Sequence, residues 1–363
     1  MNTDVLIVGG GLSGLRLADR LSAAGVDYRL IEGRGRLGGR ILSLPASGAT
    51  EPGDRYDLGP AWFWPDQPRM QRLIDELDLA WFEQMSAGNL VMQEQNGAVR
   101  NDFTFSTMAG ARRIVGGAQS LIEALARKLT GNRILLDRKL LSLHAGDDIL
   151  TAEIETAGKL ETISARAVVV TIPPRLLAET IAFTPLLDER VMRNLSSIPT
   201  WMAGHAKVVA VYKRPFWRAK GLSGDAISRI GPLVEIHDAS PASEQEGALF
   251  GFVGVPSDKR RGYDAAIIDA SIAQLVTLFG AEAAHPKDVL YEDWSVDRFT
   301  ATEQDASGNL THPSYGPLPP LDAPWAGRVF FASTEMALQY GGFLEGALEA
   351  AEQVLREMTI AKA

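Results

Sequence analysis

Hydrophobic and polar positions follow a regular order over the first forty residues of the chain. An apolar run, Val5 to Val8, has the pattern of a strand buried on both faces, and it stops at three consecutive glycines. Apolar positions then recur at helical spacing from Leu15 to Leu21, before a second strand, Tyr28 to Ile31, leads into Glu32. The order strand, glycine turn, helix, strand, acid predicts a Rossmann-type unit that binds an adenine dinucleotide.

The glycines of this turn have separate physical roles. Gly9 permits the tight turn, Gly11 lets the backbone approach a pyrophosphate, and Gly14 allows the helix to pack closely on the strand. The N-terminus of the helix offers free N–H groups and a partial positive charge to the phosphates. Glu32 lies where a carboxylate can accept hydrogen bonds from ribose hydroxyls, which favours NAD or FAD over NADP.

The segment after Glu32, GRGRLGGRI, alternates glycines with arginines. Such a segment suits a backbone that passes close to a ligand while guanidinium groups face its phosphates. The alternative is a basic, flexible surface loop. Its position directly after the nucleotide-binding strand favours the ligand-binding interpretation.

The remaining pattern predicts two domains, each assembled from separate parts of the chain. Residues 1–70, 113–195 and 295–363 are predicted to form the nucleotide-binding domain, and residues 71–112 and 196–294 a substrate-binding domain. Predicted strands cover residues 134–136, 140–143, 149–155, 168–172, 207–212, 235–237, 249–255 and 329–332. Predicted helices lie within 113–129, over 265–279, and from about residue 342 onward.

These motifs together resemble the flavin-containing amine oxidases, the monoamine and polyamine oxidase group. The pairing of the glycine turn with ExRxRxGGR is similar to the start of that family. The resemblance recurs in order along the chain, in YDLGPAWFWPDQPR (56–69), RIVGGAQSLIEALARKL (113–129), AVVVTIPPRLL (167–177), HAKVVAVYKRPFW (205–217) and VFFASTEMALQYGGFLEGALEAAEQVL (329–355). It implies an α/β fold with a Rossmann-type, glutathione-reductase-like FAD-binding domain and a second α+β substrate domain built on a mixed sheet.

The resemblance also implies which residues hold the FAD. The glycine turn and the loop after it would supply Gly9, Gly11, Leu12, Ser13, Gly14, Glu32, Gly33, Arg34, Gly38, Gly39 and Arg40. The middle of the chain would supply Gly59, Pro60, Ala61, Trp62, Leu140 and Trp294. The C-terminal part would supply Ser333, Thr334, Glu335, Gly342, Phe343, Leu344 and Ala347. The last helix would both pack through its apolar face and stabilise negative charge on the flavin with its N-terminus.

Lys207 is the sharpest catalytic candidate. It lies in an apolar strand, AKVVAVY, where a charge is normally excluded. Strand alternation alone favours a lysine that points to solvent. The resemblance instead implies an inward lysine that holds a water against the flavin and assists reaction with dioxygen. Burial would shift such a lysine toward its neutral form.

The predicted substrate pocket departs from the family. The resemblance implies two tyrosines beside the flavin, but Phe343 occupies one position and the other falls near Gln304. Trp62 stands where related L-amino acid oxidases carry a carboxylate-binding arginine, and it is a further site candidate. Trp64, Trp294 and Tyr340 could supply other aromatic walls, and Glu303, Asp305 or Asp238 could attract a cationic amine.

Composition and charge exclude several classes of partner and cofactor site. A net charge of −9 argues against nucleic acid or an anionic membrane as the main partner, and no apolar run is long enough to span a membrane. The chain enters its first strand at Asp4, which predicts a cytoplasmic protein without a secretory signal. Because it has no cysteine, it cannot be a dithiol flavoenzyme, and its FAD should be noncovalent. Its five histidines show no metal-binding spacing.

We therefore expect an FAD-dependent oxidoreductase that oxidises the C–N bond of a small amine by hydride transfer to the flavin. Dioxygen is the expected electron acceptor, and an imine or aldehyde and hydrogen peroxide are the expected products. A flavin desaturase or dehydrogenase of the phytoene desaturase or protoporphyrinogen oxidase type, which uses another acceptor, is the alternative. A protein that keeps FAD as a structural or sensory element is a third possibility.

Overall fold

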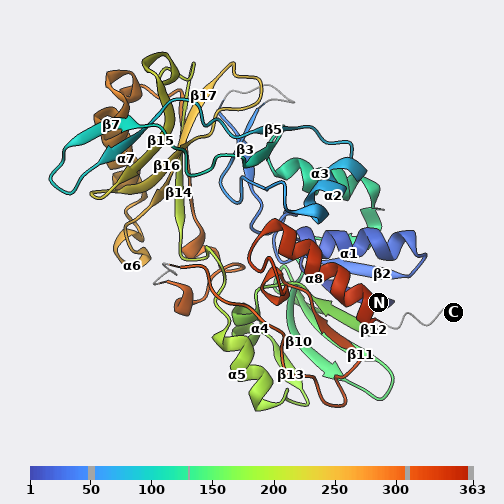
Figure 1. Ribbon diagram of the computed structural model, residues 1–363. Helices are drawn as coiled ribbons and strands as arrows, with labels where there is room; N and C mark the ends of the chain where they lie inside the picture. The colour runs from blue at the N-terminus through green and yellow to red at the C-terminus, as the bar shows by residue number, and fades with distance from the viewer. Residues whose placement is uncertain (48–53, 130, 307–310, 359–363) are drawn as a thin grey trace.

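The computed structural model describes residues 1–47, 54–129, 131–306 and 311–358. Two mixed sheets organise these residues, and Figure 1 shows them at opposite ends of the molecule. The larger sheet has the strand order β13-β10-β11-β12-β1-β2-β9, with β19 also paired to β12. Its strands are β1 (Asn2–Val8), β2 (Tyr28–Ile31), β9 (Ile134–Leu135), β10 (Lys139–Ala145), β11 (Leu150–Thr156), β12 (Lys159–Val170), β13 (Ala182–Thr184) and β19 (Val329–Phe331).

The parallel part of the larger sheet is the predicted Rossmann-type unit. Strand β1 pairs in parallel with both β2 and β12, and β12 pairs in parallel with β19. Strands β10, β11 and β12 add an antiparallel meander beside it. The α/β fold class is therefore confirmed. The strand predicted over 168–172 begins nine residues earlier than expected at Lys159 and ends at Val170.

Helices cover both faces of the larger sheet. On one face, β1 packs against α1, α3 and α8 through Leu15, Leu121 and Leu348. On the other face, Leu177 of α4 and Leu195 of α5 pack against β1 and β12. The helices of the chain are α1 (Leu12–Ala23), α2 (Pro68–Glu76), α3 (Gln119–Lys128), α4 (Pro174–Thr180), α5 (Glu189–Ser197), α6 (Ser257–Arg260), α7 (Asp264–Phe279) and α8 (Leu344–Glu357).

The smaller sheet has the strand order β18-β14-β17-β16-β15-β6-β7. It contains the predicted strands near residues 207, 235 and 249, together with others that the sequence pattern did not separate. Its strands are β6 (Asn89–Gln93), β7 (Val99–Phe103), β14 (Ala206–Tyr212), β15 (Leu222–Ser228), β16 (Leu233–Asp238), β17 (Gly247–Val253) and β18 (Asp288–Asp293).

The two faces of the smaller sheet have different neighbours. Val208 and Ala210 of β14 pack against helix α7, which covers one face. Val209 and Val211, which alternate with them, pack against the segment that carries Tyr56 and Leu58. That segment comes after the nucleotide-binding unit in the chain. The second face of the smaller sheet is therefore the one that faces the larger sheet. Two further sheets have two antiparallel strands each: β3 (Ser43–Pro45) pairs with β4 (Arg55–Asp57), and β5 (Trp81–Glu83) pairs with β8 (Arg112–Ile114).

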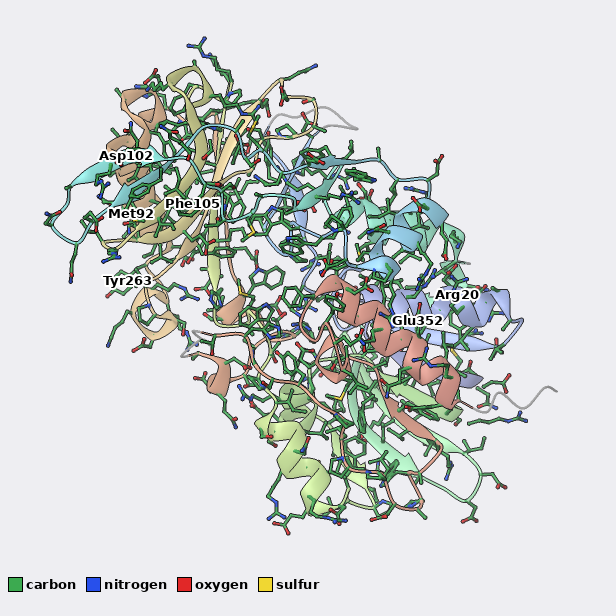
Figure 2. The ribbon with its side chains drawn as sticks, in the orientation of Figure 1. Arg20, Met92, Asp102, Phe105, Tyr263 and Glu352 are labelled. Atoms are coloured by element: carbon green, nitrogen blue, oxygen red, sulfur yellow. The ribbon has the colours of Figure 1, made fainter. Side chains whose placement is uncertain are left out.

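The exact domain boundaries stay a prediction. Helix α2 crosses the boundary predicted at residue 70, and it packs with α8 in the core of the larger sheet. Figure 2 shows Arg20 of α1 and Glu352 of α8 on adjoining helices at this end of the molecule, with Met92 and Phe105 at the other end, on the smaller sheet and the segment that follows β7.

Two glycines of the dinucleotide turn are required by the local packing. Gly9 has a φ of 110°, and a Cβ atom there would lie 2.5 Å from Thr171 Oγ1. A Cβ atom on Gly14 would overlap the carbonyl oxygen of Gly9, which belongs to rigid backbone. The first turn of α1 can therefore approach β1 only if both positions lack a side chain.

We expect Gly14→Ala to lower the free energy of unfolding by about 1–3 kcal/mol, because the added methyl group must displace backbone. Urea unfolding monitored by circular dichroism measures the change. Gly131→Ala is the matched control, since a Cβ atom there meets open space. Equal stability of the two variants would contradict the close approach described for Gly14.

Candidate functional site

The turn between β1 and α1 is organised around the side chain of Glu32. Its two carboxylate oxygens accept hydrogen bonds from the backbone N–H groups of Gly10, at 2.7 Å, and Arg34, at 2.9 Å. Gly11 caps α1, and a Cβ atom there would have only the carbonyl oxygen of Gly38 nearby, at 3.9 Å. The backbone at Gly11 is thus not covered by neighbouring atoms, its contact with a pyrophosphate stays a prediction, and Glu32 fixes the shape of the turn.

A cavity of about 570 Å³ opens beside this turn. Its volume falls in the range of small-molecule and cofactor sites, and it suits the adenosine half of a dinucleotide. Five of the predicted cofactor residues line it, namely Gly9, Glu32, Gly33, Arg34 and Leu140. The opposite wall comes from residues 295–303, which follow β18.

Arg34 makes contacts that the sequence did not predict. Its guanidinium donates to both carboxylate oxygens of Asp297, at 2.8 and 2.9 Å, and to Thr300 Oγ1 at 2.8 Å. The Phe299 ring lies 5.2 Å from the same group and covers Gly33. Arg34 therefore holds the far wall of the cavity in place, and its role toward phosphate stays a prediction.

The C-terminal part of the chain closes the site from another side. Arg40, on the loop after β2, donates to both oxygens of the fully buried Glu335, at 2.7 and 3.1 Å. Thr334 Oγ1 donates to the carbonyl of Phe343, where α8 begins, and Ser13 Oγ donates to the carbonyl of Ala332. These hydrogen bonds connect the glycine turn before α1, the loop after β2 that carries Arg40 (the arginine loop), and the segment before α8.

One buried polar atom in this region has no hydrogen-bond partner within the described residues. The Ser333 side chain is buried, and its hydroxyl finds no acceptor or donor there. An unsatisfied buried hydroxyl costs free energy unless a ligand or water pairs with it. This unpaired hydroxyl follows Ala332, whose carbonyl accepts from Ser13 in the first turn of α1, and it fits a polar cofactor chain. Gly342 (φ 85°) leads into α8, whose first residues Leu344 and Ala347 pack in the core near Leu12.

Lys207 points inward from β14 and is almost fully buried. Its ammonium donates to the carbonyl oxygens of Asp57, at 3.1 Å, and Gly59, at 2.7 Å, and lies 4.2 Å from the Phe250 ring. Burial lowers the pKa of Lys207 to about 7, against the opposing effect of the Asp57 carboxylate. The solvent-facing alternative is therefore wrong, and the inward orientation is observed.

The segment that holds Lys207 also positions the predicted tryptophans. A Cβ atom on Gly59 would overlap the backbone of Arg40, so the segment with Pro60 and Ala61 runs tightly past the arginine loop. Trp62 donates from Nε1 to Gln84 Oε1 at 2.9 Å, and buried Trp294 donates from Nε1 to the carbonyl of Leu58 at 3.0 Å.

A continuous series of aromatic rings connects the start of α8 to the smaller sheet. Neighbouring ring centroids lie 4.7–6.4 Å apart throughout, and His312 stacks flat on Phe343 at 5.0 Å. We call this series the aromatic belt; in order its members are Trp64, Phe343, His312, Trp201, His205, Phe252, Phe250 and Trp62.

The aromatic belt contains Phe343, Trp62 and Trp64, which the sequence singled out, and five rings that it did not. Phe250 and Phe252 could have been found, because they are two positions apart in β17 and therefore share one face of the sheet. Trp201 and His312 lie outside strands and helices, and no sequence pattern connects them. Tyr340, by contrast, donates its hydroxyl to Asp66 and is not part of the belt.

The acidic candidates proposed to attract an amine are engaged elsewhere. Asp305 is buried, pairs with Arg175 at 2.5 Å and caps the short 3₁₀ turn Glu303–Asp305 that contains Gln304. Asp238 accepts from Trp217 and Arg218. The Glu303 side chain is exposed and faces Arg261. Beside the belt, Glu235 and Asp225 flank His237, whose ring lies 5.0 Å from that of Trp62.

The comparisons agree with this architecture. The sequence matches the model of the flavin containing amine oxidoreductases over residues 81–358, and that of the NAD(P)-binding Rossmann-like domain over residues 7–77. The chain belongs to the flavin-containing amine oxidoreductase family. It is accordingly an FAD-dependent oxidoreductase, and the predicted family and cofactor are both confirmed.

Relatives of this amine oxidoreductase cover it almost end to end. A probable flavin-containing monoamine oxidase A of Dictyostelium discoideum is 23% identical over 98% of this chain and 97% of its own length. Putrescine oxidase of Kocuria rosea is 26% identical over 85% of each chain. The first alignment runs over 468 positions, whereas this chain has 363 residues, so that relative carries long segments without a counterpart here.

Solved structures share the fold of this amine oxidoreductase. Putrescine oxidase bound to putrescine superposes with a TM-score of 0.80 at 20% identity, over 98% of this chain and 99% of that one. Cyclohexylamine oxidase from Brevibacterium oxydans IH-35A gives 0.81 at 18% identity, over 99% of each chain.

Two further features of the amine oxidoreductase concern membranes and metals. Across residues 1–47, 54–129, 131–306 and 311–358, no helix has both the length and the apolar character needed to cross a bilayer. The same part of the chain contains no group of three or more histidine and carboxylate side chains placed to hold a metal ion.

The buried lysine makes stability depend on pH. Its pKa is about 7 in the folded protein and 10.5 in a solvated lysine, so the unfolded chain binds more protons between these values. The penalty of burying the charge is present below pH 7 and disappears as the pH rises. Relative to Lys207→Met, the unfolding free energy of the wild type should therefore increase by about 2 kcal/mol between pH 7 and 9.

Urea unfolding of the FAD-bound wild type and variant at both pH values measures this difference. Lys159→Met is the control, since Lys159 is exposed, and its stability should follow the wild type at both pH values. A wild-type-to-Lys207→Met difference that does not change with pH would show that Lys207 is not desolvated.

Proposed function

We propose that this protein oxidises the C–N bond of a primary or secondary amine and passes the electrons to dioxygen. The observation that carries the proposal is the inward Lys207 beside the aromatic belt, between the start of α8 and the smaller sheet. Bound FAD supplies the acceptor for the hydride equivalent that leaves the amine carbon. The protein supplies orientation, exclusion of water and control of protons around that step.

The aromatic belt favours a substrate amine whose carbon chain or ring is apolar. Its rings present apolar faces and weakly polar edges, which hold hydrocarbon and also attract a cation. The two relatives named for putrescine and cyclohexylamine act on small alkyl amines by their names, which agrees with this substrate class. Phe343 is 36% exposed, so the belt is open to an entering substrate at its α8 end.

Lys207 supports the choice of dioxygen as acceptor. Its ammonium is fixed by the backbone carbonyls of Asp57 and Gly59, and within the described residues it forms no ion pair with a carboxylate. A fixed positive charge in a desolvated site stabilises negative charge that develops on oxygen as it is reduced. The products would then be an imine, which hydrolyses in water, and hydrogen peroxide.

The FAD is proposed to be held without a covalent bond, because the chain has no cysteine to attach it. Arg40, Ser333, Thr334 and the open backbone at Gly11 would contact its phosphates and ribityl chain. The cytoplasmic location stays a prediction.

Anaerobic mixing of the FAD-loaded protein with primary, secondary and polyamines tests the proposal. At least one amine should bleach the flavin absorbance within seconds, and admission of air should restore it with release of peroxide. Reoxidation by a quinone or dye but not by air would favour the desaturase-like alternative. Failure of every amine to reduce the flavin would refute amine oxidation.

Lys207→Met should separate the two half-reactions. We expect the variant to be reduced by the amine but to react with dioxygen at least tenfold more slowly, because the positive charge is lost. Stopped-flow mixing of reduced protein with oxygen measures this rate, with Lys159→Met as the matched control. Unchanged oxygen reactivity would remove Lys207 from its proposed role.

A further inference from the structure

Three histidines lie in or against the aromatic belt, and their hydrogen bonds differ. His312 has Nε2 within 2.8 Å of the carbonyl of Gly341. His237 lies between Asp225, at 3.0 Å, and Glu235, at 2.9 Å. The Nδ1 atom of His205 is buried and has no hydrogen-bond partner among the described residues. Within the described part of the chain, it is the one buried ring nitrogen of these three histidines that lacks a partner.

His205 is held at the edge of the smaller sheet, next to the proposed reaction site. The backbone N–H of Trp294 donates to the carbonyl of His205, which continues the pairing of β14 with β18. His205 therefore precedes Lys207 by two positions and shares its face of the sheet. The Phe252 ring lies 6.3 Å from the His205 ring and 5.3 Å from Lys207 Nζ. The two polar groups thus border the same part of the belt.

The charged groups around His205 keep its ring neutral. Burial lowers the pKa of His205, and the positive charge of Arg260, which pairs with Asp293, lowers it further. Lys207 on the same strand adds another buried cation. On the opposite side, the Arg40 guanidinium donates to the carbonyl of Trp201, whose ring lies 6.4 Å from His205, and its charge is paired with that of Glu335. Burial and Arg260 outweigh the opposing hydrogen bond at Met202, so the resting ring of His205 is neutral and is free to accept a proton.

We propose that His205 is the base that deprotonates the amine substrate, an inference that rests on the proposed function. An alkyl amine is an ammonium ion at neutral pH, and it has no lone pair to stabilise the positive charge that develops on the carbon as hydride leaves. In the proposed step, the substrate N–H bond breaks and leaves its electron pair on the amine nitrogen. A new N–H bond forms on the imidazole, which returns the proton to water after the product departs.

Desolvation makes this transfer feasible. The loss of water around the bound ammonium disfavours its charge by more than the weak attraction of the aromatic rings favours it, so the pKa of the substrate falls on binding. The buried Lys207 adds repulsion of like charge. A proton that would stay on the amine in water can therefore move to an adjacent neutral imidazole.

The test is the pH dependence of flavin reduction in wild type and His205→Gln, with putrescine, cyclohexylamine and benzylamine as probes. At pH 7 the second-order rate constant for anaerobic reduction should fall at least tenfold in the variant. The rate constant of the variant should recover as the pH approaches the pKa of the free amine, about 10, because the variant can react only with amine that is already neutral in solution. His285→Gln, which changes an exposed histidine outside the belt, should follow the wild type.

Superposable pH profiles of wild type and His205→Gln would overturn the inference and leave the proposed function intact. Absence of flavin reduction in the wild type would instead overturn the proposed function, and the inference with it. A second readout needs no turnover. Ring signals of His205, identified by their loss in His205→Gln, should titrate below 6.5 in nuclear magnetic resonance spectra of the FAD-bound protein. A midpoint above 7 would show that the ring already holds a proton and cannot act as the base.

Discussion

The contact of the Lys207 ammonium with two backbone carbonyls connects the smaller sheet to the segment that follows the nucleotide-binding unit. Strand β14 belongs to the smaller sheet, whereas the carbonyls of Asp57 and Gly59 belong to the segment that continues from the nucleotide-binding unit. Both partners are neutral dipoles, so the charge is solvated without being cancelled. A carboxylate in their place would make a stronger ion pair and would remove the free positive charge that the proposed oxygen chemistry requires.

This constraint orders the rest of the site. The inward lysine fixes which face of β14 looks toward the larger sheet, and that face carries Val209 and Val211 against Tyr56 and Leu58. Phe250 and Phe252, opposite on β17, then lie under the ammonium and extend the aromatic belt. Lys207 thus shares one face of the smaller sheet with the rings against which the amine is proposed to bind.

The sequence predicted local units well and contacts between distant segments poorly. The glycine turn, β1, α1, β2 and the start of α8 follow from short-range periodicity and capping chemistry, so their positions could be derived. Arg34 is an example of a contact that could not be predicted. Its partner Asp297 lies 263 positions away, and no local sequence pattern connects the two residues. The same holds for Trp201 and His312, whose rings lie 4.7 Å apart although the residues are far apart in the sequence. Strand alternation did not predict that Lys207 points inward. The family resemblance did.

The pairing of Arg40 with Glu335 also has a consequence for how the protein matures. The two residues are separated by 295 positions, and the carboxylate comes from the segment just before the final helix. During synthesis the glycine turn leaves the ribosome first, yet this side of its binding site is missing until nearly the whole polypeptide has emerged. The newly made N-terminal unit therefore lacks the carboxylate that fixes Arg40 in the finished protein, and this contact can form only late in synthesis.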